Sequence, residues 1–248
     1  MGKIKALLVG CSYDNQDLEM QAGKHDVKAM AKFMKENFDM KATRVLHEDA
    51  PDHRQPTRRN ILDGFKWLLS DVDPHKDHLF FYFAGHGGLK HGASHILPVD
   101  HEDNGHITAS KMRRELVDPL VTNQKLTGFF QHCHSGNSLE LPYLCKKPDD
   151  LENVNFTRSQ FSKIEGRYGP PYVTCFGASN LKLSAYHDNT MSFVTKEFIH
   201  NMEHGRPSNQ CATILDVFNA MEDGDRRGKP EFSTSYKVIG SAEFLETW

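Results

Sequence analysis

Apolar runs of strand length alternate with segments of helical periodicity along this chain. Such runs are typical of central strands in a parallel sheet covered on both faces, and apolar residues recurring every three or four positions indicate amphipathic helices. The sequence predicts strands at 4–9, 42–46, 79–84, 126–130, 172–176 and 236–239, an extended piece at 96–99, and helices at 24–37, after Pro56-Thr57, at 112–120 and around 193–202 and 214–221. This order favours right-handed crossovers and an α/β fold with a mostly parallel central sheet.

Two of the predicted strands are followed by reactive side chains. His86 lies just beyond strand 79–84, and Cys133 lies just beyond strand 126–130. Ligands and catalytic groups gather beyond the carboxyl ends of parallel strands, so we expect imidazole and thiol to meet there. A cysteine with a histidine in reach is the minimum machinery for thiolate attack on a carbonyl. We interpret Cys145, Cys175 and Cys211 as core residues, and His132 and His134 as local structure.

Composition restricts the class of protein. At 248 residues the chain is long enough for one α/β domain that buries a full core without disulfides or metals. Its net charge is only -3 and its basic residues are interspersed with acidic ones, which disfavours nucleic acid as a partner. Five cysteines without regular spacing indicate reduced thiols in the cytoplasm or nucleus. No stretch approaches the length of a membrane span, so no membrane partner is expected.

The surroundings of the two reactive residues resemble a known family. A cysteine motif that opens with Gln131 and has its histidine about 50 residues upstream is the caspase-type pattern. The stretch Cys133-His134-Ser135-Gly136, followed by Leu141-Pro142-Tyr143, is more similar to the metacaspases. Further similar stretches keep their order along the chain: 6–10, 56–58, 82–87, 97–100 and 230–235.

The resemblance implies a three-layer caspase-like fold and a cysteine endopeptidase that acts on proteins or peptides without a cofactor. It implies a single domain, 1–248, with a large portion at 1–145, a linker at 146–168 and a small portion at 169–248. His86 and Cys133 would form the catalytic dyad, and the main-chain N–H groups of Gly87 and Cys133 would form the oxyanion hole. Metacaspases are generally monomers, so we expect a monomer.

The resemblance also implies cleavage after Arg or Lys. The predicted substrate-binding residues are Cys11, Asp14, Ala84 and Gln131. Asp14 matches one acid of the family's primary pocket, but Gln131 stands where a second acid is usual and Ala84 replaces a serine. The later loop, often acidic in relatives, reads Ser179-Asn180-Leu181-Lys182. Arg or Lys remains the predicted preference, and an altered, non-basic specificity is the alternative.

No metal is predicted. Many metacaspases need calcium, which takes six to eight oxygen ligands. At the matching places this chain has Ala93, Ala109 and Ser110, with only Glu140 acidic, so we expect activity without calcium.

Three other readings are possible from the residues alone. A caspase-like pseudoenzyme that serves as a regulatory binding protein keeps the fold without the chemistry. A zinc hydrolase would use histidines near the thiol, but no HExxH or CxxC spacing occurs among His86, His91, His95 and His134. A dinucleotide-binding domain lacks its GxGxxG motif.

Overall fold

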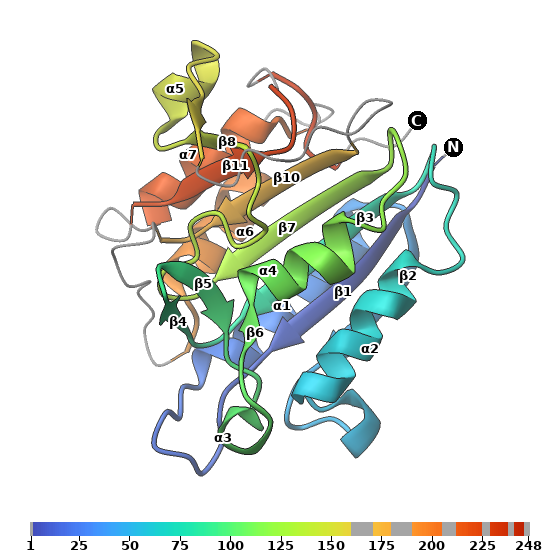
Figure 1. Ribbon diagram of the computed structural model, residues 1–248, viewed down its shortest axis with the longest axis vertical. Coiled ribbons are helices and arrows are strands. Elements are labelled where there is room, and N and C mark those ends of the chain that lie inside the picture. Colours follow the sequence, from blue (N-terminus) through green and yellow to red (C-terminus); the bar gives the residue numbers. More distant parts are fainter. Residues whose placement is uncertain are drawn as a thin grey trace.

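A twisted, mostly parallel sheet forms the centre of the computed structural model, which describes residues 2–159, 171–179, 190–204, 212–224, 229–237 and 241–245 (Figure 1). In these residues the strand order is β2-β1-β3-β7-β10-β11-β8-β9. The first five of these strands run parallel, and β11, β8 and β9 add antiparallel pairings. The strands are β1 (Ile4–Gly10), β2 (Met40–Leu46), β3 (His78–Ala84), β7 (Lys125–Gln131), β8 (Tyr143–Cys145), β9 (Thr157–Arg158), β10 (Tyr172–Gly177) and β11 (Glu231–Thr234).

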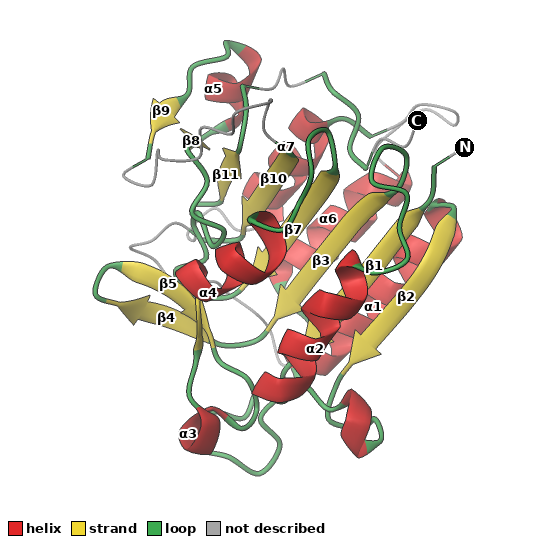
Figure 2. Cartoon of the chain, turned by 45° about the vertical axis from the view of Figure 1, so that its right-hand side comes forward, coloured by secondary structure: helices red, strands yellow, loops and turns green. Residues whose placement is uncertain are grey.

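Helices cover both faces of the sheet, which confirms the predicted three-layer α/β fold (Figures 1 and 2). One face carries α1 (Ala22–Asn37), α6 (Phe193–His204) and α7 (Ile214–Gly224). The other carries α2 (Arg58–Leu69) and α4 (Ala109–Met112), which continues into a five-residue π-helical turn, Arg113–Val117. Alternate side chains of β3 serve the two cores: Phe80 and Tyr82 pack on the first face, Phe81 and Phe83 on the second.

A small three-stranded sheet stands beyond the carboxyl ends of β3 and β7. It consists of β4 (Gly87–Lys90), β5 (Ala93–Ile96) and β6 (Ile107–Thr108), and the one-turn helix α3 (His101–Asn104) lies beside it (Figure 2). A 3-10 turn, Asp52–Arg54, follows β2. Helix α2 begins as predicted, because the Thr57 side chain accepts a hydrogen bond from the Asn60 N–H.

Two predicted elements are wrong in their bounds. Tyr236 and Lys237 are not in a strand, and residues 238–240 lie outside the described residues. Within the described residues, the last strand of the large sheet along the chain is β11, where Phe232 pairs with Phe176 and is fully buried. The predicted helix 112–120 is shifted toward the amino terminus, since α4 begins at Ala109 and the π-helical turn that continues it ends at Val117.

The predicted linker is structured where it is described. Helix α5 (Pro148–Glu152) buries Leu151, and β9 pairs antiparallel with β8, so this segment extends the sheet by one strand beyond β8. Proline at the first helical turn is favourable for α5 because its missing N–H is not needed there. Residues 160–168 lie outside the described part. The division into large and small portions stays a prediction.

Candidate active site

Strand register places His86 and Cys133 at the same edge of the sheet. Strands β3 and β7 are parallel neighbours, and Ala84 pairs with Gln131. The alignment continues past the strands, because the Gly85 N–H donates to the Gln131 carbonyl at 3.1 Å. His86 and Cys133 each follow that register pair by two positions. The sheet therefore places His86 and Cys133 just beyond the ends of adjacent strands.

Hydrogen bonds to Tyr13 and Leu18 hold His86. Its main-chain N–H donates to the Tyr13 hydroxyl at 2.8 Å, and that hydroxyl donates to the Leu97 carbonyl at 2.6 Å. The ring lies against Tyr13, with centroids 4.9 Å apart, and its Nε2 is 2.8 Å from the Leu18 carbonyl oxygen. A carbonyl oxygen only accepts, so Nε2 carries the proton and Nδ1 is the basic nitrogen.

Exposure separates Cys133 from the other described cysteines. Cys11, Cys145 and Cys175 are buried, whereas Cys133 is partly exposed. Burial raises the pKa of the Cys145 thiol to about 12 and that of the Cys175 thiol to about 12. The Cys11 pKa is also raised well above its usual value, by burial first and then by the charge of Glu48. Reactive thiols need access and a thiolate, so among the described cysteines only Cys133 has the access. Cys211 lies outside the described residues.

The loop that carries Cys133 is fixed by its own polar groups. Ser135 and Ser179 exchange hydrogen bonds: the Ser135 hydroxyl donates to the Ser179 carbonyl at 3.1 Å and accepts from its N–H at 3.0 Å. The Asn137 side chain bonds both the N–H and the carbonyl of Leu141. His134 has φ +60°, a left-handed turn immediately after the cysteine. The loops after β7 and β10 are thereby held together around the thiol.

His132 contacts both Cys133 and Gly87, a role that its interpretation as local structure did not anticipate. Its Nδ1 lies 2.8 Å from the Cys133 carbonyl, and a Cβ added at Gly87 would overlap that same Nδ1. The ring is fully buried, and burial lowers its pKa to about 3. A neutral imidazole therefore packs directly on the glycine of the predicted oxyanion hole. The sequence signal was a histidine next to the reactive cysteine.

The other predicted substrate-binding residues lie next to one another at the strand ends. Cys11 N–H donates to the Ala84 carbonyl at 2.8 Å, and Ala84 is the register partner of Gln131. Cys11 and Ala84 are essentially inaccessible, and Gln131 is 5% exposed. The side-chain carbonyl oxygen of Gln131, Oε1, is buried and has no hydrogen-bond partner in the described part of the chain. A buried acceptor in this state favours a donor from a ligand.

Asp14 is partly exposed but is already paired. The Lys24 ammonium lies 3.1 and 3.0 Å from the two Asp14 carboxylate oxygens. Below this pair, the Glu48 carboxylate accepts the N–H groups of Ser12 and Tyr13. Burial raises the Glu48 pKa, and the two N–H groups act in the opposite direction. The sequence did not reveal Lys24 as a partner of Asp14.

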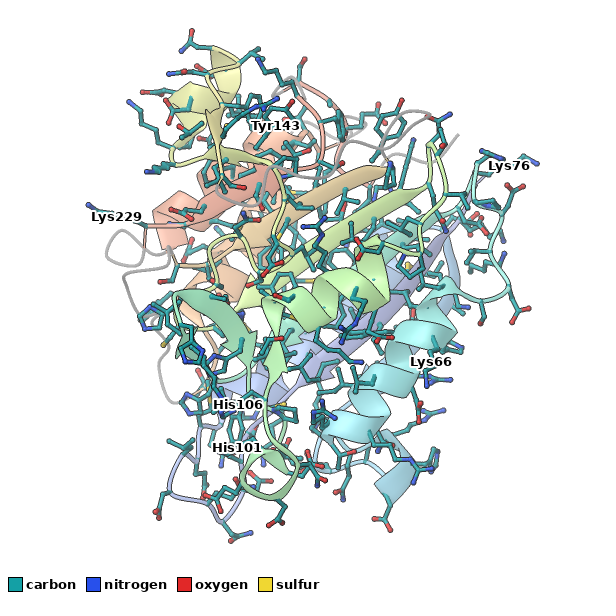
Figure 3. All side chains as sticks on the ribbon, in the orientation of Figure 1. Lys66, Lys76, His101, His106, Tyr143 and Lys229 are labelled. Carbon is teal, nitrogen blue, oxygen red and sulfur yellow. The ribbon has the colours of Figure 1, made fainter. Side chains whose placement is uncertain are left out.

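A row of histidines lies beside the site. The His95 and His106 rings are 4.5 Å apart, and His106 and His101 are 6.2 Å apart near α3 (Figure 3). Burial, with the charge of His106, lowers the pKa of His95 to about 4. Across the described ranges, no group of three or more His, Cys, Asp or Glu side chains is arranged to hold a metal ion.

Fold and site together define a caspase-like domain. The family model described as "Metacaspase, peptidase C14 domain" matches residues 4–142. The chain therefore belongs to the metacaspase family, a family of cysteine-type peptidases. No helix in the described residues is long and apolar enough to cross a membrane.

Curated relatives agree with this assignment. Metacaspase-1A of Aspergillus oryzae is 36% identical over 169 residues, which is 63% of this chain and 40% of the relative. Metacaspase-1A of Aspergillus niger is 37% identical over 172 residues, which is 63% of this chain and 42% of that relative. Metacaspase-1 of Botryotinia fuckeliana is 37% identical over 169 residues, which is 63% of this chain and 40% of that relative. The chain thus matches about two-fifths of the length of these relatives.

A solved structure shares the fold. The crystal structure of protein GSU0716 from Geobacter sulfurreducens has a TM-score of 0.67 to this chain at 14% sequence identity. The match covers 98% of this chain and 100% of the other. At this identity the likeness concerns the fold alone.

Proposed function

We propose that this chain is a cysteine endopeptidase in which Cys133 is the nucleophile and His86 the general base and acid. One observation carries the proposal: an accessible thiol and a histidine with a basic Nδ1 leave the sheet at the same register on adjacent strands. The hydrogen bond to Leu18 fixes the tautomer that proton transfer from a thiol requires.

The reaction follows acyl-transfer chemistry. The Cys133 thiol gives its proton to His86 Nδ1, and the thiolate attacks the peptide carbonyl carbon of the substrate. The N–H groups of Gly87 and Cys133 donate to the developing oxyanion. His86 then protonates the leaving amine as the C–N bond breaks, which leaves a thioester on Cys133. Water, deprotonated by His86, hydrolyses the thioester and regenerates the thiol.

The proposed specificity is for Arg or Lys before the scissile bond. Asp14 supplies a carboxylate in the loop after β1, and the unpartnered Oε1 of Gln131 supplies a neutral acceptor. Both groups suit a side chain that only donates hydrogen bonds, as Arg and Lys do.

We further propose that activity does not require calcium. The one acidic residue at the places matching the family's calcium ligands is Glu140, and it is already used: its carboxylate accepts from the Ser110 hydroxyl at 2.7 Å. The other matching positions include Ala93 and Ala109, which have no side-chain oxygen. One paired carboxylate does not supply the several charged oxygens that calcium takes.

The monomeric state and the division into two portions are proposals as well. Strands β8 and β9 cover the edge of β11, and an edge covered by further strands is not available for pairing with a second copy. The partners proposed are protein or peptide substrates in the cytoplasm or nucleus, with no nucleic acid or membrane.

A peptide panel tests the proposal. Peptides with Arg, Lys, Gln or Asp before the scissile bond are incubated with the parent and with Cys133→Ala, in calcium and in chelator. We expect cleavage after Arg or Lys in chelator, absent from the variant. Cleavage only after Gln or Asp would refute the basic specificity. No cleavage by a folded parent would favour a pseudoenzyme that binds a partner.

A further inference from the structure

Lys24 forms an ion pair with Asp14, the residue whose carboxylate binds the substrate side chain in the proposed function. It lies in the first turn of α1, where its N–H donates to the Ser12 hydroxyl at 2.9 Å. Its ammonium contacts both oxygens of Asp14, and only 16% of the Lys24 side chain is exposed. The hydrogen bond to Asp14 raises the Lys24 pKa, so the ammonium stays charged. In the free protein Asp14 is thus neutralised from within the chain.

The same lysine has a second partner in reach. The Asp49 carboxylate lies 3.8 Å from the Lys24 ammonium, against 3.0 Å for Asp14. Asp49 also binds Lys28 at 2.7 Å. A small movement of the Lys24 side chain therefore exchanges one carboxylate for another without leaving its charge uncompensated. The pair is also partly exposed, which lowers the free energy needed to separate it.

We infer that Lys24 is a specificity-determining residue, an internal cation that a basic substrate side chain must displace from Asp14. This inference rests on the proposed function, in which Asp14 belongs to the substrate pocket. Lys24 then weakens the binding of every basic side chain. It also favours Arg over Lys, because a planar guanidinium binds a carboxylate through two parallel N–H groups, whereas a substrate lysine only repeats the contact that Lys24 already makes.

Kinetics of Lys24→Met test the inference. We expect KM for Arg and Lys peptides to fall by about two- to fivefold, the range of a partly exposed ion pair, with kcat little changed. We also expect the ratio of Arg to Lys cleavage to decrease. Lys24→Gln removes the charge but keeps a donor beside Asp14, and the same direction is expected. Lys32→Met is the matched control, because Lys32 lies on the same helix but forms its ion pair with Glu36, and it should leave KM at the parent value.

Binding measured without catalysis separates this inference from the proposed function. Agmatine, which carries a guanidinium and no scissile bond, is titrated calorimetrically into Cys133→Ala and into Cys133→Ala/Lys24→Met. Tighter binding to the double variant supports the inference even if no peptide is cleaved, in which case the proposed function alone fails. The same titration is made with Cys133→Ala/Lys24→Gln. If neither double variant binds agmatine more tightly than Cys133→Ala does, the inference is overturned, and Lys24 is a residue that orients Asp14.

Discussion

His86 Nε2 lies 2.8 Å from the main-chain carbonyl oxygen of Leu18, in the loop that follows β1. No carboxylate is needed in this contact to set the tautomer, since a carbonyl can only accept. Tyr13, from the same loop, contacts the ring and accepts the His86 N–H. One loop therefore orients the proposed base through both its main chain and its imidazole.

Tyr13→Phe tests this orientation. The change removes the Tyr13 hydroxyl that accepts from the partly buried His86 N–H and donates to the Leu97 carbonyl. We expect a stability loss of about 1–3 kcal/mol in urea unfolding, and kcat/KM about tenfold lower, equivalent to ~1.4 kcal/mol of transition-state stabilisation.

Tyr82→Phe is the matched control for that experiment. It removes a buried hydroxyl that bonds Thr195 at 2.7 Å, on the face covered by α1 and α6. We expect a similar loss of stability with kcat/KM unchanged. An equal fall of kcat/KM in both variants would show that the Tyr13 effect is a general consequence of destabilisation.

Gly87→Ala should remove activity through sterics. A Cβ at this position would overlap Nδ1 of His132, so the main chain of Gly87 must move away from the proposed oxyanion. Loss of one oxyanion donor lowers kcat by about 100-fold or more. Gly88→Ala is the control at the neighbouring position. Its Cβ would meet only the His95 ring at 3.1 Å, so a smaller loss of activity is expected. Activity of Gly87→Ala near the parent value would exclude Gly87 from the oxyanion hole.

Stability should fall in mild acid because two histidines are buried in neutral form. Their pKa is lowered from 6.5 to about 3 for His132 and to about 4 for His95. The unfolded chain takes up both protons near pH 6.5, so this stability is fully present above pH 6.5 and is lost as pH falls towards 4 and then 3. Each histidine contributes a slope of about 1.4 kcal/mol per pH unit.

Urea unfolding between roughly pH 7 and pH 3, a span that covers both pKa shifts, measures this slope. His95→Gln should reduce the slope of unfolding free energy against pH by about 1.4 kcal/mol per pH unit, because the variant has no titrating group at this position. The exposed His75, replaced in the same way, provides the surface control. A slope that is identical in His95→Gln and parent would contradict the lowered pKa of His95.

Calcium should leave the reaction rate unchanged. Glu140 is 6% exposed and accepts from Ser110, so a calcium ion would have to break a buried hydrogen bond to use it. The measurement compares hydrolysis in chelator with hydrolysis across micromolar to millimolar calcium. A large activation would contradict the proposal, and loss of that activation in Glu140→Gln would then identify Glu140 as a ligand.

The sequence by itself determined the layers and the positions of the two reactive residues. The strand at 79–84 is a continuous apolar run and carries its signal locally, because strands buried on both faces need apolar side chains throughout. The placement of His86 and Cys133 followed, since parallel neighbours end at one edge. Short strands such as β4, β8 and β9 were missed, because two to four residues carry too little pattern to be distinguished from a loop.

Only the tertiary structure decided which groups surround those residues. The pairing of Asp14 with Lys24, the bond from His86 to Leu18 and the packing of His132 on Gly87 depend on how loops from different strands meet. Contacts of this kind are set by side-chain geometry between segments, and periodicity along one segment does not encode them. The sequence thus located the proposed chemistry, and the fold determined the tautomer of His86, the ion pair of Asp14 and the side chain that packs on Gly87.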